Sequence, residues 1–502
     1  MFQLYNFTKP TPKQRSSGVT ELRLNIPYLL LLTTLQRISF SPINVACAGA
    51  QRELLLWLIH HALPSANLHD RDANGETPHF SAVNGLNGEV DDTSLSGDTR
   101  KREEFISFLL DQGWSVRDSN VFVQQDFNVD NQIEKTVLGA AIRYASQKMV
   151  SCLIAEGADV HAQQIWRDHT PMRRSDHIEN GAKVTALHIA SMFWNLEGIR
   201  ALLVHPEDET VAEMISSTDD HGRIPLHWAL QGTRDEPHRE LNKNKEYQSP
   251  PRKMDTVQLL VSASPDTISA TDRHGATVFN YAVKSDSALP GILAIVKILL
   301  DAKPPALNTR DLIGATALQD AMVHHSRRMG GILDPQFAEL VDTLLDNGAD
   351  AHLSLHKLFA GSWLDSISTV MIEHLLKQTD INETDADGCT AMHYAVRNMD
   401  QIDATRYLIS RGADVTVKNH KGDTPLHNVM GGTMIWKRDE NKKPLKSHDT
   451  PIKVRAELIQ MLIDAGGSMD FRNAAGQTPT QMLEEVDQRR KMRARQFFPR
   501  PV

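Results

Sequence analysis

Apolar and small residues recur along the chain in pairs of short segments. In the first segment of a pair they lie three and four residues apart, as at Leu226, Ala229 and Leu230, which puts them on one face of a short helix. The second segment carries paired leucines, such as Leu344 with Leu345, and often ends in "GAD". A glycine suits a helix end because it accepts the left-handed cap conformation. The pattern therefore predicts an all-α chain built from two-helix units.

A polar turn ending in glycine precedes the first helix of most units. In "DADG" (385–388) and "KNHKG" (418–422), Asp and Asn favour a turn and glycine accepts a positive φ. In "TPLH" (424–427) the threonine can cap the helix, and proline at the first helical position loses no hydrogen bond. The motif recurs clearly at 220–230, 273–283, 312–322, 386–396, 420–430 and 474–483, and more weakly at 40–50, 73–83, 133–142 and 182–191.

The glycines of these turns give the period of the repeat. Gly388 to Gly422 is 34 residues, Gly275 to Gly314 is 39, and Gly314 to Gly388 is 74, which is two units of 37 with a degenerate unit at "LHKLFAGSW" between them. At this point the chain resembles the ankyrin-repeat family, whose unit is about 33 residues long with a T-P-L-H-x-A signature. The resemblance implies an ankyrin-repeat solenoid of stacked helix-turn-helix units with short β-turn fingers, in which no unit buries its apolar face alone.

The ends and interruptions of the repeat give the domain organisation. We expect a disordered N-terminus (1–20), an N-terminal capping helix (21–38), an array of about ten to eleven units (39–488) and a basic tail (489–502). The apolar run "IPYLLLLTTL" (26–35) also resembles a signal peptide, but it is short and interrupted by threonines, which favours a buried helix. Long inserts are expected near 84–100, 161–181, 232–253, 284–291, 323–333 and 431–451.

The inserts allow two interpretations. Insertions at one position of a repeat map to one edge of a stacked array, and five of the six lie between the first and second helices. They are either tolerated surface loops, which cost little loop-closure entropy, or a composite docking surface with Tyr247 and Trp436 as contacts.

Composition and charge restrict the class of protein. The chain of 502 residues is 40% apolar and 23% charged, which fits a globular fold. Its formal charge of -9 gives no general attraction to nucleic acid or anionic membranes, and about 20 apolar residues in succession, as a membrane span needs, do not occur. Cys47, Cys152 and Cys389 lie far apart without a CxxC pair, which indicates a reducing intracellular compartment, nucleus or cytoplasm. We expect a monomer.

The histidines of the motif are predicted to be structural. Asn280 and Gln319 fill the same fourth position in other units, which indicates a need for a hydrogen-bonding group and not for an ionisable one. Cys389 lies near His393, but both belong to repeating positions and no third orienting group is indicated. No catalytic, cofactor-binding or metal motif is present, so we expect no enzyme, cofactor or metal. The histidines expected to hydrogen-bond across adjacent turns are His188, His227, His393 and His427.

The family resemblance implies a binding site on the concave face formed by turn tips and first helices. The residue after the signature histidine is aromatic in the middle of the array, and aromatic side chains are favoured binding anchors. Because this position is often semi-buried in ankyrin arrays, partner contact and inter-repeat packing both stay open. The candidates for partner contact are Ile189, Trp228, Tyr281, Tyr394 and, on an insert, Trp436.

The leading functional hypothesis is a non-catalytic scaffold or adaptor that binds other proteins, without direct contact to nucleic acid or membrane. One alternative is a nuclear transcriptional coregulator acting through a DNA-binding partner, since the chain resembles insert-rich ankyrin proteins of filamentous fungi; another is a regulatory or substrate-adaptor subunit of a separate enzyme. The basic tail is compatible with nuclear import, with an acidic partner, or with a solvated helix end. Its cations are Arg489, Arg490, Lys491, Arg493 and Arg495.

Overall fold

The computed structural model places helices in pairs along the chain, in two compact units. Unit 1 runs to Met214, and unit 2 begins at Ile215. The structure describes residues 41–62, 71, 76–84, 97–117, 119–123, 132–166, 181–204, 208–232, 251–285, 289–302, 305–328, 335–361, 367, 369–431, 449–485 and 488.

Each repeat contributes a first and a second helix, as the sequence predicts. The first helices are α2 (Pro42–Ala48), α4 (Pro78–Asn84), α6 (Val137–Ala141), α8 (Ala186–Met192), α11 (Pro225–Gln231), α13 (Val278–Lys284), α15 (Ala317–Arg328), α17 (Ser354–Gly361), α19 (Ala391–Ala395), α21 (Pro425–Gly431) and a helix over 479–485. The second helices are α3 (Arg52–Trp57), α5 (Gly97–Asp111), α7 (Gln147–Ala155), α9 (Leu196–Leu203), α12 (Pro251–Ala263), α14 (Leu289–Asp301), α16 (Pro335–Asp346), α18 (Thr369–Leu376), α20 (Ile402–Ser410) and α22 (Asp449–Asp464).

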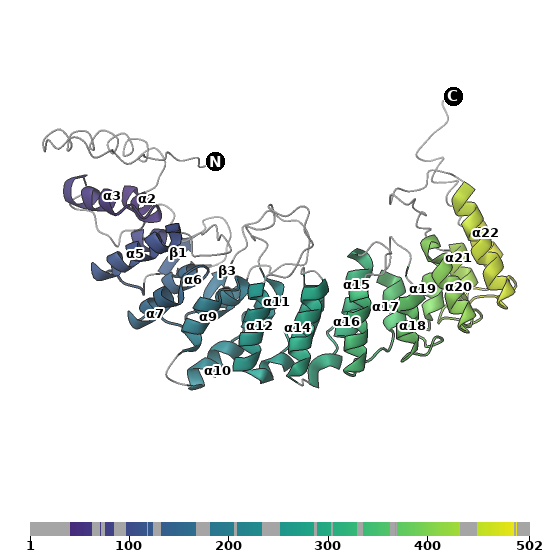
Figure 1. Ribbon diagram of the computed structural model, residues 1–502. Coiled ribbons are helices and arrows are strands. Elements are labelled where there is room, and N and C mark those ends of the chain that lie inside the picture. The colour runs from purple at the N-terminus through teal and green to yellow at the C-terminus, as the bar shows by residue number, and fades with distance from the viewer. Residues whose placement is uncertain are drawn as a thin grey trace, which may run out of the picture. The chain divides into compact units, whose positions relative to one another are not determined.

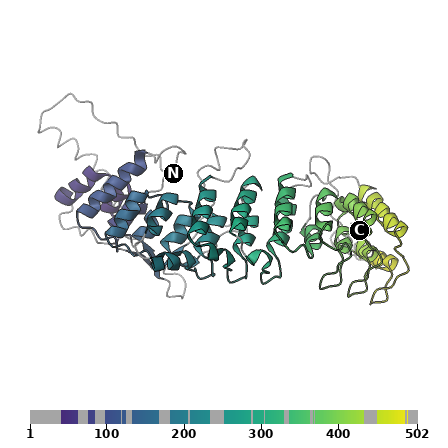
Figure 2. The same cartoon turned by 60° about the horizontal axis from the view of Figure 1, so that its bottom comes forward.

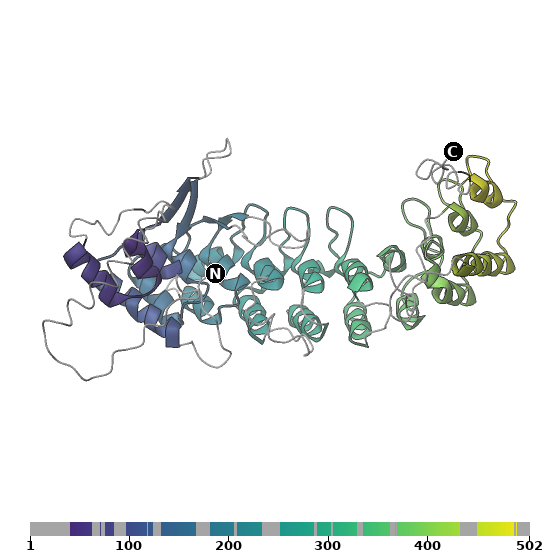
Figure 3. The same ribbon diagram turned by 90° about the horizontal axis from the view of Figure 1, so that it is seen from above.

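The two kinds of helix form two separate rows within unit 2 (Figures 1 and 3). Helices α11, α13, α15, α17, α19 and α21 contact one another in sequence order, and α12, α14, α16, α18, α20 and α22 do the same. Leu226 and Phe279 of the first row and Val296 and Leu344 of the second are fully buried or nearly so. The core therefore lies between the rows and continues from one repeat to the next.

A few elements depart from the two-helix pattern. A π-helical turn (Leu58–Ala62) continues α3, α10 (Asp208–Ser216) spans the boundary between the units, and 3₁₀ turns cover Pro265–Ser269, Pro305–Asn308 and Met399–Gln401. In unit 1, β1 (Ser119–Val123) pairs antiparallel with β2 (Gln132–Thr136), with Ser119 opposite Thr136. The strands β3 (Gln164–Trp166) and β4 (Gly181–Val184) pair in the same way. The predicted insert at 161–181 therefore contains β3 near its start and ends at the first residue of β4.

Several predicted insert boundaries are wrong because helices extend into them. α5, α12, α14 and α22 begin at Gly97, Pro251, Leu289 and Asp449, within the segments assigned to inserts. α15 continues to Arg328, so its last six residues lie in the insert predicted from 323. Part of each predicted insert lies outside the described residues. The same holds for the predicted disordered N-terminus (1–20), the predicted capping helix (21–38), the basic tail (489–502), Tyr247 and Trp436.

Candidate functional site

Six polar turns of unit 2 share one architecture, and we call them fingers (Figure 2). Each finger begins with Asp or Asn, whose Oδ1 accepts the backbone N–H groups two and four residues later at 2.8–3.1 Å. The glycine three residues after it has a positive φ, which an L-residue adopts only with strain. These bonds stabilise the turn, because they give its main-chain N–H groups an acceptor within the turn itself. The fingers are 219–223, 272–276, 311–315, 385–389, 419–423 and 473–477.

Adjacent fingers are joined by main-chain hydrogen bonds. The carbonyl before the glycine accepts the N–H of the first tip residue of the next finger, at 2.7–2.8 Å. These bonds align the fingers at fixed spacing along one edge of unit 2. The pairs are Arg273 to His221, Leu312 to His274, His420 to Asp387 and Ala474 to Lys421, donor first.

The signature histidines lie where the first helix begins. Nδ1 of His393 accepts the backbone N–H of Thr390 at 3.0 Å and lies 2.9 Å from its hydroxyl. Nε2 of His393 lies 3.1 Å from the carbonyl oxygen of Asp423 in the next finger, and Nε2 of His427 lies 3.2 Å from that of Gln477. Each ring therefore caps its own helix and ties its repeat to the next.

The side chains at the fourth motif position of other repeats make equivalent hydrogen bonds. Oδ1 of Asn280 accepts the N–H of Thr277 at 2.9 Å, and Nε2 of Gln319 donates to the carbonyl of His352 at 2.6 Å. His188 lies 2.8 Å from the hydroxyl of Thr185, and Nδ1 of His227 accepts the N–H of Ile224 at 3.2 Å. Since an amide replaces the imidazole, the position needs hydrogen bonds and not a titrating group.

The aromatic residue after the signature position bonds back to its own finger. Trp228 Nε1, Tyr281 Oη and Tyr394 Oη each donate to Oδ2 of the aspartate nine residues earlier. The distances are 3.0 Å to Asp219, 2.9 Å to Asp272 and 2.7 Å to Asp385. Sequence reasoning missed this role for the aspartates. The constant spacing of nine residues between Asp and an aromatic donor was the signal that could have found it.

The predicted contact residues differ in exposure. Ile189 is 1% exposed and Trp228 0%, so neither offers a surface to a partner, and both fit the packing alternative. Tyr281 and Tyr394 are half-buried, with edges against the rings of His227 and His356. Both tyrosines are partly accessible, and both stay candidates for partner contact.

Cys389 and His393 do not form a nucleophile and base. Both ring nitrogens of His393 are already bonded to Thr390 and Asp423, and the Cys389 sulfur accepts from Asn419 Nδ2 at 3.5 Å. Burial raises the pKa of the Cys389 thiol, whereas an activated cysteine needs a lowered pKa.

Asp219, Asp220 and His221 come within metal-ligand distance of one another. Both carboxylate oxygens of Asp219, however, already accept hydrogen bonds within the protein. Asp219 accepts from the N–H groups of His221 and Arg223, from Arg223 Nε at 2.7 Å and from Trp228 Nε1. Burial alone would raise the pKa of Asp219, but Arg223 and these hydrogen bonds lower it below its usual value. This cluster is a turn with a buried ion pair.

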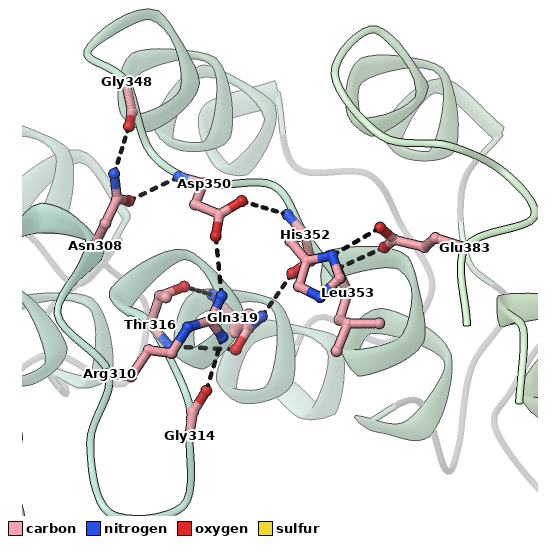
Figure 4. Close-up of polar contacts among 10 residues, drawn as sticks. All are labelled: Asn308, Arg310, Gly314, Thr316, Gln319, Gly348, Asp350, His352, Leu353 and Glu383. Carbon is pink, nitrogen blue, oxygen red and sulfur yellow. Dashed lines mark hydrogen bonds and ion pairs between the residues drawn. The ribbon is translucent and has the colours of Figure 1, made fainter. Parts of the chain in front are cut away.

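The degenerate unit has a signature histidine, His356, but no finger. Figure 4 shows the polar contacts of the turn that precedes its first helix. After α16 the chain reaches α17 directly through residues 347–353, where Leu353 takes a positive φ of 57°. Glu383 accepts the N–H of Leu353 at 2.5 Å and lies 3.0 Å from Nδ1 of His352. His356, which sequence reasoning missed, lies 2.9 Å from the carbonyl oxygen of Cys389 through Nε2, as His393 does with Asp423.

The family follows from this geometry together with a match to a known sequence pattern. Residues 364–430 match the family model for ankyrin repeats in three copies, and this segment contains the fingers 385–389 and 419–423 and the capping histidines His393 and His427. The chain contains ankyrin repeats. Ankyrin repeats are protein–protein interaction modules, and the fingers and capping histidines described above are the parts of this array.

Relatives share the ankyrin repeats over parts of their length. The chain is 28% identical over 250 residues to the human B-cell lymphoma 3 protein, covering 44% of this chain and 50% of that one. It is 28% identical over 171 residues to the ankyrin repeat protein OPG189 of variola virus, covering 32% and 28%. The chain thus spans half or less of these relatives. The crystal structure of the ankyrin repeat domain of Bcl-3, a member of the IkappaB protein family, aligns at 19% identity and a TM-score of 0.31, over 61% of this chain and 98% of that one.

Among the residues that the structure describes, no helix has both the length and the apolar character needed to cross a membrane.

The buried histidines predict acid sensitivity of this ankyrin array. Burial lowers the pKa of His227 from 6.5 to about 4, although Asp272 opposes the shift, and burial also lowers those of His356 and His393. Because the unfolded chain binds the proton more tightly, stability from His227 is complete above pH 6.5 and is lost as the pH falls toward 4. The full loss is on the order of 3 kcal/mol.

Urea unfolding at a series of pH values measures this dependence. We expect the midpoint to fall between pH 6.5 and 4. His227→Asn, with the amide that Asn280 supplies at the same position, should flatten the dependence. A variant with the slope of the wild type would show that His227 does not cause it.

Proposed function

We propose that this ankyrin array is a non-catalytic scaffold or adaptor that binds other proteins through the tips of its fingers. The observation that carries the proposal is that some residues of each finger are constant and others vary. The Asp or Asn and the glycine are constant and hold the turn, whereas the two tip residues between them differ in every finger. From the second finger on, these tips are exposed: Arg273 and His274, Leu312 and Ile313, Ala386 and Asp387, His420 and Lys421, Ala474 and Ala475.

The bonding of the motif residues supports the non-catalytic part of the proposal. The fully buried His393 is held by Thr390 and Asp423, and the Cys389 thiol has a raised pKa. Groups bonded and buried in this way suit a framework, because an acid or base that acts on a substrate must reach it. A binding surface of exposed, chemically varied tips on a rigid support loses little entropy on association.

Co-purification from cells followed by quantitative mass spectrometry tests the proposal. In one variant the exposed tips are replaced by Arg273→Ser, Leu312→Ser, Ile313→Ser and Lys421→Ser. In a second variant a short Gly-Ser linker replaces residues 432–448, which lie between α21 and α22. We expect the tip variant to lose recovered proteins at least tenfold, with unfolding unchanged because the tips are exposed. Full retention by the tip variant, together with loss of recovered proteins on replacement of 432–448, would show that partners bind the inserts and not the finger tips.

A nuclear coregulator acting through a DNA-binding partner is the second candidate. The basic run from Arg489 to Arg495 favours it, since clustered cations suit nuclear import. A fluorescent fusion of the full chain should then concentrate in the nucleus and lose this preference when residues 488–502 are removed. Equal distribution of both fusions would count against the nuclear version. An enzyme subunit among the recovered proteins would favour the regulatory or substrate-adaptor alternative.

A further inference from the structure

Among the described residues, one position in the row of fingers of unit 2 is empty, because the degenerate unit contributes none. The finger at 311–315 precedes this position and the finger at 385–389 follows it; between them residues 347–353 connect α16 directly to α17 (Figure 4). We call it the missing-finger position. It differs from the other finger positions in the hydrogen bonding of the main-chain groups and in the side chains on its two sides.

The main-chain bonding of the fingers is interrupted on both sides. Elsewhere the second tip carbonyl accepts an N–H from the next finger at 2.7–2.8 Å. Within the described part of the chain, the carbonyl of Ile313 has no such donor and the N–H of Ala386 has no such acceptor. The missing-finger position therefore presents an acceptor on one side and a donor on the other.

The glycines show the same opening independently. A methyl group at Gly275 or Gly422 would meet main-chain atoms of the next finger at 3.3 Å or 2.6 Å, and one at Gly388 would meet His420 at 2.9 Å. A methyl group at Gly314 would meet no described atom within 4 Å. This side of the finger is open, as it is at Gly476 of the last finger, whereas the equivalent side of the four other fingers is covered.

The finger next to the opening has an apolar tip. Leu312 is 76% exposed and Ile313 is 78% exposed, and they are adjacent in sequence. The equivalent exposed positions of the other fingers carry charged residues, histidine or alanine, such as Arg273 with His274 and Ala474 with Ala475. Two large aliphatic side chains at a turn tip add nothing to the fold, whereas covering them with a partner removes apolar area from water.

The apolar tip is held in place before any partner arrives. Asp311 Oδ1 accepts the N–H of Ile313 at 3.1 Å and that of Ala315 at 2.8 Å. Arg310 bonds the carbonyl of Gly314 at 3.1 Å and Oδ2 of Asp350 at 2.9 Å, which anchors the finger to the turn of the degenerate unit. A preordered tip loses little conformational entropy on binding.

We infer that a tight turn of a partner protein occupies the missing-finger position, packs an aliphatic side chain on Leu312 and Ile313, and donates a main-chain N–H to the Ile313 carbonyl. A turn is the occupant because it offers both an N–H and a C=O, as the fingers themselves do, and so matches Ile313 on one side and Ala386 on the other. This inference rests on the proposed role in protein binding and names the form of the partner at one site of the array.

Disulfide-closed peptides test the inference directly. A displayed library of seven-residue loops, with a fixed Asp-x-x-Gly core and aliphatic residues at the two variable tip positions, is selected on the full-length chain. Peptide affinities are then measured by fluorescence anisotropy. Leu312→Asp/Ile313→Asp should weaken binding at least tenfold, and bound peptide should slow hydrogen exchange of the Ala386 amide. The matched control is Ala474→Asp/Ala475→Asp, since Gly476 of that finger also meets nothing within 4 Å but its tip is small.

The outcomes separate this inference from the proposed function. Selected peptides that bind the wild type and the Leu312→Asp/Ile313→Asp variant equally, or a library that yields no binder, would overturn the inference. Thermal unfolding of the variant should match the wild type, because both tip residues are exposed. Proteins that co-purify equally with wild type and variant would overturn the inference and leave the proposed function standing; a wild-type chain that recovers no protein would overturn the proposed function itself.

Discussion

Trp228→Ala is expected to destabilise the protein by about 3–5 kcal/mol, the usual effect of removing a fully buried tryptophan. The side chain is 0% exposed, and its indole N–H is one of the four donors that Asp219 accepts. Truncation to alanine leaves a cavity and also removes this hydrogen bond. Urea unfolding followed by far-UV circular dichroism measures the loss as a shift of the midpoint.

Trp228→Phe is the matched control for the cavity. It keeps most of the packing but removes the N–H, so the expected loss is smaller, about 1–3 kcal/mol, as for a hydrogen bond to a charged acceptor. Unchanged unfolding of Trp228→Ala, combined with loss of a bound protein, would instead make Trp228 a contact residue and contradict its placement in the core.

Asp219→Ala should have a comparable effect for a different reason. Arg223 is 6% exposed, and its Nε lies 2.7 Å from Asp219 Oδ2. Removing one partner of a buried ion pair leaves an uncompensated charge and costs about 3–5 kcal/mol. The finger also loses the acceptor for the N–H groups of His221 and Arg223, so proteolysis within this finger should accelerate.

Asp385→Ala separates the ion pair from the turn. Asp385 holds its finger through the N–H groups of Asp387 and Cys389 and through Tyr394, but its hydrogen bonds include no arginine. Its loss should therefore be smaller, about 1–2 kcal/mol. In Asp219→Ala/Arg223→Met the buried charge is gone, and part of the stability should return. Equal losses for Asp219→Ala and Asp385→Ala would show that the ion pair contributes nothing beyond the turn.

Local sequence signals predicted the elements well where one residue type has one physical role. Glycine at a positive φ, proline at the helix start and apolar residues at helical spacing identified the fingers and the first helices. A hydrogen-bonding role for the histidines was also expected from the sequence, because Asn280 and Gln319 occupy the same position in other repeats. That the rings cap their own helices was not predicted.

Other features depend on how distant residues pack, and local patterns do not report them. The strands β1 and β2 replace a finger in unit 1, and "SNVFV" pairs with "QIEKT" only because the fold aligns them. Trp228 is buried beside Arg223 and Asp219, and the repeat motif gives no sign that these three residues interact. The missing finger was readable in principle: Gly348 precedes His356 by eight residues, whereas Gly412 precedes His427 by fifteen.

Hydrogen–deuterium exchange of the full chain, with and without a protein recovered by co-purification, tests the central claim most directly. If the finger tips bind partners and the capping residues hold the framework, protection on binding should concentrate at the tips, foremost around residues 310–315 and 385–389. The second helices should exchange as in the free chain. Protection confined to the second helices, with exchange at every finger unchanged, would contradict the account.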